Sequence, residues 1–291
     1  MTSTTTTTTT TTAELSALSC TNDEDLRVPF YCEENIWRLC YKRQERQRRQ
    51  GQGVQPQHNV NANPDQDFVL FISNAQKCCP IFHQKATASS SRRNQPCFWD
   101  YHVILLSIHC SKTTNSIATY RTTASHTQTP PQKPQTQQQQ QLLLQRQAWI
   151  YDFDSTLPFP CPFQQYIQES FSYSFPLHLQ PLFRIVSANS YLQHFYSNRM
   201  HMYDTITQAW LQTPPLYTCI MNGYNSTSSE YSTSSSHSSN VFQGSNLHLY
   251  HTMQDQHTMQ HQTIINQKLS LLDDSMYGLV VDLATLYTTW V

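Results

Sequence analysis

The chain has 291 residues, of which 38% are hydrophobic and 13% are charged, and its 18 basic and 19 acidic side chains give a net charge of −1. Globular domains average roughly 45–50% apolar and about 25% charged residues, so uncharged polar residues replace part of the usual core-forming composition. Because a net charge of −1 provides no attractive field for them, nucleic acid and an acidic membrane surface are not expected as partners.

The uncharged polar residues are concentrated in low-complexity tracts, the clearest of which are Thr4 to Thr12, Gln137 to Gln141 and Ser232 to Ser239. Such tracts bury too little apolar area to offset the entropy lost on ordering. We therefore predict a disordered threonine-rich tail over 1–25 and one domain over 26–291. Polar insertions near 43–67, 111–147 and 223–263 interrupt that domain.

The chain start lacks the positive segment and apolar run of a secretory signal. Purely apolar runs in the middle of the chain, such as Phe68 to Ile72 and Val103 to Leu106, are far below the ~18 residues of a membrane span. We expect a protein of the cytoplasm or nucleus with no membrane partner. Its nine cysteines are then expected to be reduced, and their odd number leaves at least one free thiol.

The first predicted element is a helix over 31–40, where apolar residues recur at helical spacing and two acids occupy the first turn. Cys32 lies near the N-terminus of this helix. The basic stretch 42–49 predicts a solvated continuation, and a nuclear-targeting or nucleic-acid-binding patch remains the alternative.

Continuous runs of β-forming residues follow. Residues 68–72 predict a strand that is buried on both faces, and 80–82 a short partner for it. Residues 97–108 predict a central strand and 149–154 another strand.

Pairing of 103–109 with 148–153 would form a hairpin, and the polar segment 111–147 would then be an expanded loop. Loop-closure entropy rises only logarithmically with length, so this insertion costs little.

The prolines in 157–162 exclude a central strand there. Beyond them we predict a helix over 164–171, a strand over 183–186 and a helix over 190–196. The apolar tail 264–291 is expected to return to the core. Mixed strands and helices in this order predict an α/β or α+β fold.

A possible nucleophile is Cys32, because a helix N-terminus favours the thiolate form of a cysteine. His102, at the start of a buried strand, is the best-placed histidine to act as its base. Asp152 would face His102 if the two strands are adjacent, and would orient the imidazole. The residues alone also permit simpler roles, namely core packing for Cys32, a buried hydrogen-bonded His102 and a turn or cap at Asp152.

Metal and cofactor motifs are weak. The chain has no C-x-x-C, and the pairs His248/His251 and His257/His261 lie in or beside a polar tract without cysteines or acids to complete a site. Five glycines provide no phosphate-binding loop. We therefore expect no metal and no cofactor.

Four segments in chain order carry a resemblance to a known family: Tyr31–Cys40 (YCEENIWRLC), Val69–Asn74, Trp99–Val103 and Ile150–Cys161. The first closely resembles the nucleophile segment of the protein N-terminal glutamine amidohydrolases, and the others follow in the order of that family. Weaker matches continue through Phe183–Val186, Ser190–Leu192, His201–Met202 and Pro214–Pro215.

The resemblance implies a monomeric α/β hydrolase with a core like those of transglutaminases and papain-like enzymes. Such an enzyme converts glutamine at the free N-terminus of a protein or peptide into glutamate and releases ammonia. The product enters the N-degron pathway by arginylation. The catalytic Cys, His and Asp of the family fall on Cys32, His102 and Asp152.

Recognition of an N-terminal residue requires a group that pairs with the α-ammonium, because burying that cation alone costs several kcal/mol. The acids near the motifs are Glu33, Glu34, Asp100 and Asp154. We keep Glu33, Asp100 and Asp154 as substrate-binding candidates, with a cap or surface role as the alternative for each.

Two other functions remain open. One is an inactive Gln/Thr-rich interaction protein that associates through its polar tracts, and the other is a transglutaminase or cysteine protease with the same triad.

Overall fold

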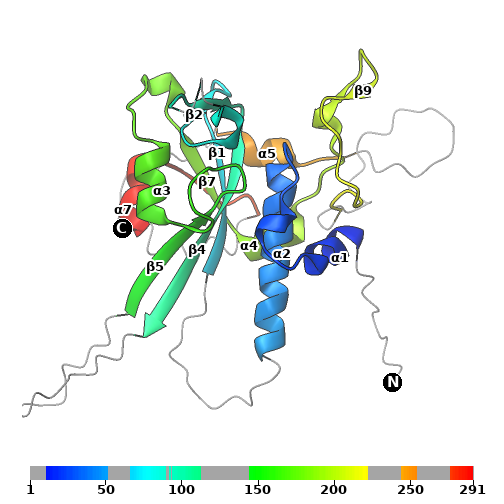
Figure 1. Ribbon diagram of the computed structural model, residues 1–291, viewed down its shortest axis with the longest axis horizontal. Helices are drawn as coiled ribbons and strands as arrows, with labels where there is room; N and C mark the ends of the chain where they lie inside the picture. The colour runs from blue at the N-terminus through cyan, green and yellow to red at the C-terminus, as the bar shows by residue number, and fades with distance from the viewer. Residues whose placement is uncertain are drawn as a thin grey trace, which may run out of the picture.

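The computed structural model describes residues 11–51, 66–89, 92, 94–112, 144–221, 244–253 and 276–290. They form a mixed arrangement of helices around a central sheet (Figure 1). None of the helices in these ranges is long and apolar enough to cross a membrane.

Within the described residues, six strands form one sheet in the order β10-β7-β1-β4-β5-β6. Their bounds are β1 (Gln66–Ser73), β4 (His102–Lys112), β5 (Leu144–Tyr151), β6 (Cys161–Pro162), β7 (Leu182–Ser187) and β10 (Leu279–Asp282). Every neighbouring pair is antiparallel. The fold is therefore the α+β alternative of the two predicted classes, without the parallel sheet of an α/β protein.

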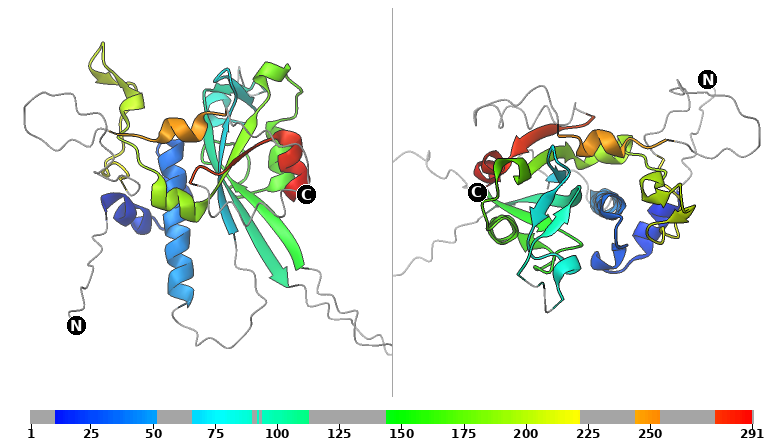
Figure 2. Two further views of the ribbon diagram at one scale, coloured as in Figure 1. Left: turned by 180° about the vertical axis from the view of Figure 1, so that it is seen from behind. Right: turned by 90° about the horizontal axis from the view of Figure 1, so that it is seen from above.

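Helices cover both faces of this sheet (Figure 2). One face packs against α2 (Cys32–Gly51), α4 (Ala188–His194) and α5 (Leu247–His251), and α1 (Thr12–Ser19) packs on the outside of α2. The opposite face is covered by α3 (Phe163–Ser170) and α7 (Leu283–Trp290). Shorter elements complete the chain: η1 (Glu24–Leu26), β2 (Cys79–Ile81), η2 (Lys85–Thr87), β3 (Cys97–Trp99), η3 (Leu177–Leu179), η4 (Met200–Met202), β8 (Tyr203–Asp204) and β9 (Ala209–Trp210).

The central strands β1 and β4 are continuous apolar runs because both of their faces are buried. Side chains alternate between faces along a strand. Val69, Phe71, Val103 and Leu105 accordingly join the core on the α2 face. The residues between them join the core on the α3 and α7 face.

Several predicted elements are confirmed. The helix predicted over 31–40 and its continuation are α2, and the predicted 68–72 strand lies within β1. The next helix, strand and helix correspond to α3, β7 and α4 within a few residues. The proline-containing β6 lies at the edge of the sheet, where a missing N–H donor is tolerated.

The predicted hairpin is also confirmed. Strands β4 and β5 pair from Leu105 with Tyr151 to Lys112 with Leu144. Of the predicted polar loop 111–147, residues 113–143 lie outside the described residues.

Three segments that we predicted to be a disordered tail or polar insertions contribute to the fold. Residues 11–25 are not a disordered tail, because Ala13 of α1 is buried in the core and Thr11 caps the helix. Arg43 reaches the sheet, where its guanidinium pairs with Asp67 at 2.7 Å. Tyr250 of α5, within the predicted 223–263 insertion, is fully buried.

The strand predicted over 97–108 is broken at Asp100 and Tyr101. Its first part, β3, pairs with β2 in a separate two-stranded sheet, so 80–82 is not the partner of the 68–72 strand. At the break the Ser73 hydroxyl donates to the Asp100 carbonyl at 2.6 Å, which satisfies a backbone group that leaves the ladder. The predicted return of the tail is confirmed for residues 276–290, because β10 pairs with β7.

The hairpin predicts that residues 113–143 are dispensable for folding. We expect their replacement by a short turn to leave the free energy of unfolding unchanged or up to roughly 2 kcal/mol higher, because a shorter loop costs less entropy to close. Urea unfolding measures this. As a control, removal of 108–148 also deletes paired residues of β4 and β5 and should destabilise the protein. A large loss of stability in the first variant would contradict the hairpin interpretation.

Candidate active site

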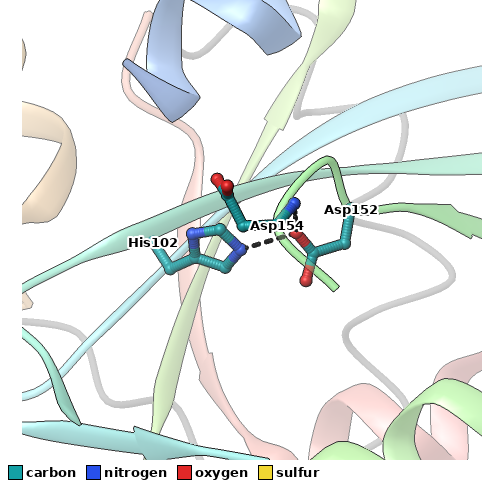
Figure 3. Close-up of side chains that lie close together, drawn as sticks. All are labelled: His102, Asp152 and Asp154. Carbon is teal, nitrogen blue, oxygen red and sulfur yellow. Dashed lines mark hydrogen bonds and ion pairs between the residues drawn. The ribbon is translucent and has the colours of Figure 1, made fainter. Parts of the chain in front are cut away.

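The structure brings together two of the predicted catalytic residues, His102 and Asp152. His102 is the first residue of β4, and Asp152 directly follows the last residue of β5. The Nε2 atom of His102 lies 2.8 Å from Oδ1 of Asp152, a hydrogen bond between two buried side chains (Figure 3). The predicted adjacency of these two side chains is thus confirmed.

Asp152 receives additional hydrogen bonds from three other residues. The Tyr166 hydroxyl of α3 donates to Oδ2 at 2.8 Å, and the Gln84 amide donates to the same oxygen at 3.2 Å. The backbone N–H of Asp154 donates to Oδ1 at 2.9 Å. These donors fix the carboxylate and favour its charged form.

Burial alone would lower the pKa of His102, but the charge and hydrogen bond of Asp152 outweigh it and raise the pKa above its ordinary value. Burial likewise opposes ionisation of Asp152, but its interaction with His102 lowers the pKa of that carboxyl. The pair therefore favours a protonated imidazole next to a carboxylate.

The other ring nitrogen of His102, Nδ1, is buried and makes no hydrogen bond in the described part of the chain. With Nε2 occupied by Asp152, Nδ1 is the nitrogen that is left to exchange a proton with a nucleophile or a leaving group.

Cys32 is the first residue of α2, as predicted, and is only 4% exposed. Its thiol lies 3.6 Å from a carboxylate oxygen of Glu33. A hydrogen bond from the backbone of Val103, the residue after His102, also acts on the sulfur. The start of α2 therefore lies against the start of β4.

The expected low thiol pKa is not found. Burial, followed by the negative charges of Glu33, Asp154 and Asp152, raises the pKa of Cys32 well above 9.0, and the Val103 hydrogen bond opposes this only in part. In this environment the thiol is protonated and needs a base to become a nucleophile.

The three predicted substrate-binding acids have different environments. Asp100 is exposed. Asp154 is buried and its Oδ1 pairs with the Arg27 guanidinium at 2.7 Å, while Oδ2 has no hydrogen-bond partner among the described residues. Glu33 is fully buried and accepts a hydrogen bond from the Tyr101 hydroxyl at 3.2 Å.

Glu34, the fourth acid considered from the sequence, has a structural environment. Both of its oxygens accept hydrogen bonds from the Arg199 guanidinium, at 2.7 and 2.8 Å. Arg199 also donates to the carbonyls of Pro215 and Tyr217. This arrangement holds the chain after α4 against the first turn of α2.

Sequence reasoning missed several residues around the site: Arg27, Gln84, Tyr101, Tyr166, Arg199 and His201. His201 Nε2 lies 3.4 Å from Oε1 of Glu33. Burial opposes its protonation, but the Glu33 carboxylate outweighs burial and raises the pKa of His201. The only sequence signal for this residue was its place in the weaker family matches.

The site also contains a group of three side chains that could hold a metal ion, the only such group among the described residues. Ligand atoms of His102, Asp152 and Asp154 all lie within 4.8 Å of one another. Two of these atoms, Nε2 of His102 and Oδ1 of Asp152, are joined by the hydrogen bond of 2.8 Å, which is the geometry of an acid–base pair.

The sequence matches the family described as N-terminal glutamine amidase over residues 27–274, a range that includes Cys32, His102 and Asp152. The chain belongs to this family. It is 32% identical over 196 residues to the protein N-terminal glutamine amidohydrolase of Bos taurus, covering 66% of this chain and 69% of that protein. The Homo sapiens protein of the same name is also 32% identical over 196 residues, with 66% and 70% coverage. The Arabidopsis thaliana protein is 33% identical over 208 residues, with 70% and 73% coverage.

For this family member the His102–Asp152 pair predicts a pH-dependent stability. The pKa of Asp152 is lowered from 3.8, so its contribution is present above about pH 4 and is lost as acid protonates it. The pKa of His102 is raised from 6.5, so its contribution to the free energy of unfolding is present below about pH 6.5. This contribution is lost as the pH rises through the raised pKa.

The variant Asp152→Asn keeps the shape of the side chain and removes its charge. We expect the loss of unfolding free energy to be greater near about pH 5 than near about pH 8.5, because the charged pair is formed at the lower pH and His102 loses its proton as the pH rises. Urea unfolding across this range measures the difference. Ser170→Ala, a buried change of a non-titrating α3 side chain, should have a pH-independent effect. An equal loss at both pH values for Asp152→Asn would contradict the charged pair.

Proposed function

We propose that this protein is a hydrolase that deamidates N-terminal glutamine in proteins and peptides to glutamate and releases ammonia. Family membership supports the reaction. The observation that carries the proposal is the buried His102–Asp152 pair. It leaves Nδ1 of His102 available, and the next residue, Val103, contacts the Cys32 sulfur. The chemistry needs no cofactor.

In the proposed mechanism Cys32, His102 and Asp152 act as a triad. From the neutral form of His102, Nδ1 accepts the Cys32 proton while the Cys32 sulfur attacks the carbon of the substrate γ-carboxamide. The resulting imidazolium gives that proton to the departing nitrogen, so ammonia leaves and a γ-glutamyl thioester remains. Water, activated by His102, then hydrolyses the thioester to glutamate and restores the thiol.

The raised pKa of Cys32 agrees with this order of events. A thiol that is protonated at rest is activated only when a base accepts its proton during attack. Asp152 stabilises the imidazolium that forms, because it favours the charged ring. The backbone N–H of Cys32, at the start of α2, is our candidate donor to the tetrahedral oxygen.

We further propose that the enzyme acts as a monomer with a transglutaminase-like or papain-like core. A transglutaminase would transfer the glutamyl group to an amine, so this site must admit water and exclude amines. The expected products feed the N-degron pathway through arginylation in the cytoplasm or nucleus.

The reaction is tested with two peptides of the same composition, one with glutamine at position one and the other with glutamine at position two. We expect ammonia from the first only. The variants Cys32→Ala and Cys32→Ser should stay folded and lose at least about a thousandfold in kcat, because removal of a nucleophile eliminates the covalent route. Ammonia release and circular dichroism measure the two properties.

A matched control is Cys40→Ala, which alters a buried cysteine of the same helix and should keep most of the turnover if the protein remains folded. Ammonia from the internal glutamine, cleavage of the peptide bond or substantial turnover by folded Cys32→Ala would each contradict the proposal. A wild-type protein without any turnover would favour the interaction-protein alternative.

A further inference from the structure

The buried carboxylates around Cys32 differ in whether a side-chain cation is paired with them. Three have a hydrogen-bonded partner: Asp152 with His102, Asp154 with Arg27 and Glu34 with Arg199. Glu33, which is fully buried, has no arginine or lysine contact among the described residues. Glu33 is therefore the one of these four carboxylates that has neither an arginine partner nor a hydrogen bond of 2.8 Å to a histidine.

The two oxygens of Glu33 are unequally satisfied. Oε2 accepts hydrogen bonds from the Tyr101 hydroxyl at 3.2 Å and from the Cys32 thiol at 3.6 Å, whereas Oε1 receives no hydrogen bond from the described residues. The contact of Oε1 is with His201 Nε2 at 3.4 Å, and an imidazole is a cation only when it is protonated. A buried carboxylate needs a cation beside it, so an ammonium that replaces this long contact with His201 and donates directly to Oε1 would be favoured.

The position of Glu33 fits one cation in particular. Its carboxylate lies 3.6 Å from the Cys32 sulfur, which is the proposed nucleophile. In a glutamine residue three carbon atoms separate the carboxamide carbon from the α-nitrogen. A substrate whose carboxamide carbon is at the sulfur therefore carries its α-ammonium within reach of the neighbouring carboxylate.

We propose that Glu33 binds the α-ammonium of the substrate and thereby restricts the reaction to N-terminal glutamine. The ammonium takes the place of His201 beside Oε1, while Tyr101 continues to hold Oε2. An internal glutamine has an uncharged amide at this position and leaves the carboxylate unpaired. This assignment rests on the proposed function and adds the group that determines its specificity.

His201 lies on the side from which a substrate can approach. Its side chain is 27% exposed, while Glu33 is fully buried, so displacement of this imidazole uncovers the carboxylate. His201 belongs to η4, whose first residue, Met200, is exposed. The other two acid candidates fit less well, because Asp154 already pairs with Arg27 and Asp100 is exposed.

The test compares a peptide with N-terminal glutamine to the same peptide with a 4-carbamoylbutanoyl group in place of that residue, which lacks only the α-amino group. We expect Glu33→Gln to lower kcat/KM for the glutamine peptide by roughly 30-fold or more, because it removes one partner of a buried charge pair. The value for the desamino peptide should change far less. The ratio of kcat/KM for the glutamine peptide to that for the desamino peptide should therefore fall towards one. A general loss of folding or of thiol reactivity would not change this ratio.

The same substitution at Glu169, on α3 and partly exposed, is the matched control and should preserve the preference. Dissociation constants for both peptides, measured with Cys32→Ala and with the double variant Cys32→Ala, Glu33→Gln, give a readout independent of turnover. Cys32→Ala should bind the glutamine peptide more tightly than the desamino peptide, and the double variant should bind both alike.

Equal losses for both peptides in Glu33→Gln, or a preference that survives it, would overturn the assignment. Collapse of the preference in Asp154→Asn or Asp100→Asn instead would assign the ammonium to that residue and would also overturn it. In both cases ammonia release by the wild-type protein would leave the proposed function intact. Absence of both turnover and selective binding would overturn the function and this assignment together.

Discussion

The buried hydrogen bond between His102 and Asp152 is the interaction on which the rest of the site depends. Two titratable side chains in the interior are tolerable only when each stabilises the charged form of the other and the remaining polar atoms have partners. The β4–β5 register brings the start of one strand to the end of its neighbour, and α3 supplies the Tyr166 hydroxyl that completes the support of the carboxylate. The sheet and α3 thus act together to hold one imidazole in a fixed orientation.

The environment of Cys32 shows which of two opposing effects determines a thiol pKa. A helix N-terminus stabilises an anion by roughly 0.3–1 kcal/mol, whereas burying a charge costs several kcal/mol. At Cys32 burial and three nearby carboxylates prevail, so the helix start alone does not activate the thiol. The same carboxylates that disfavour a resting thiolate are suited to a cationic substrate, which would offset their charge when it binds. In the proposed mechanism, thiol reactivity and substrate binding are therefore coupled.

Local patterns in the sequence predicted the elements that carry the chemistry. The helical spacing at 31–40 indicated α2, and the apolar runs indicated β1 and β4 of the sheet. The predicted pairing of 103–109 with 148–153 placed Asp152 near His102. What could not be predicted depends on contacts between distant segments. Composition could not show that Arg43 crosses to Asp67, because the same basic residue in a solvated helix has the same sequence signature. Nor could it show that Arg199 neutralises Glu34 and leaves Glu33 without a permanent cation, since only the fold brings residue 199 to the start of α2.

The most direct test of the central claim, attack by Cys32 with His102 as its base, is to trap the covalent intermediate. Wild-type protein is mixed with excess N-terminal glutamine peptide, quenched with acid during turnover and digested for mass spectrometry. The account predicts a γ-glutamyl thioester on Cys32 that disappears as the substrate is consumed, and no adduct when glutamine is at the second position. Ammonia release without an adduct on Cys32 when the quench is fast, or an adduct on another cysteine, would contradict it.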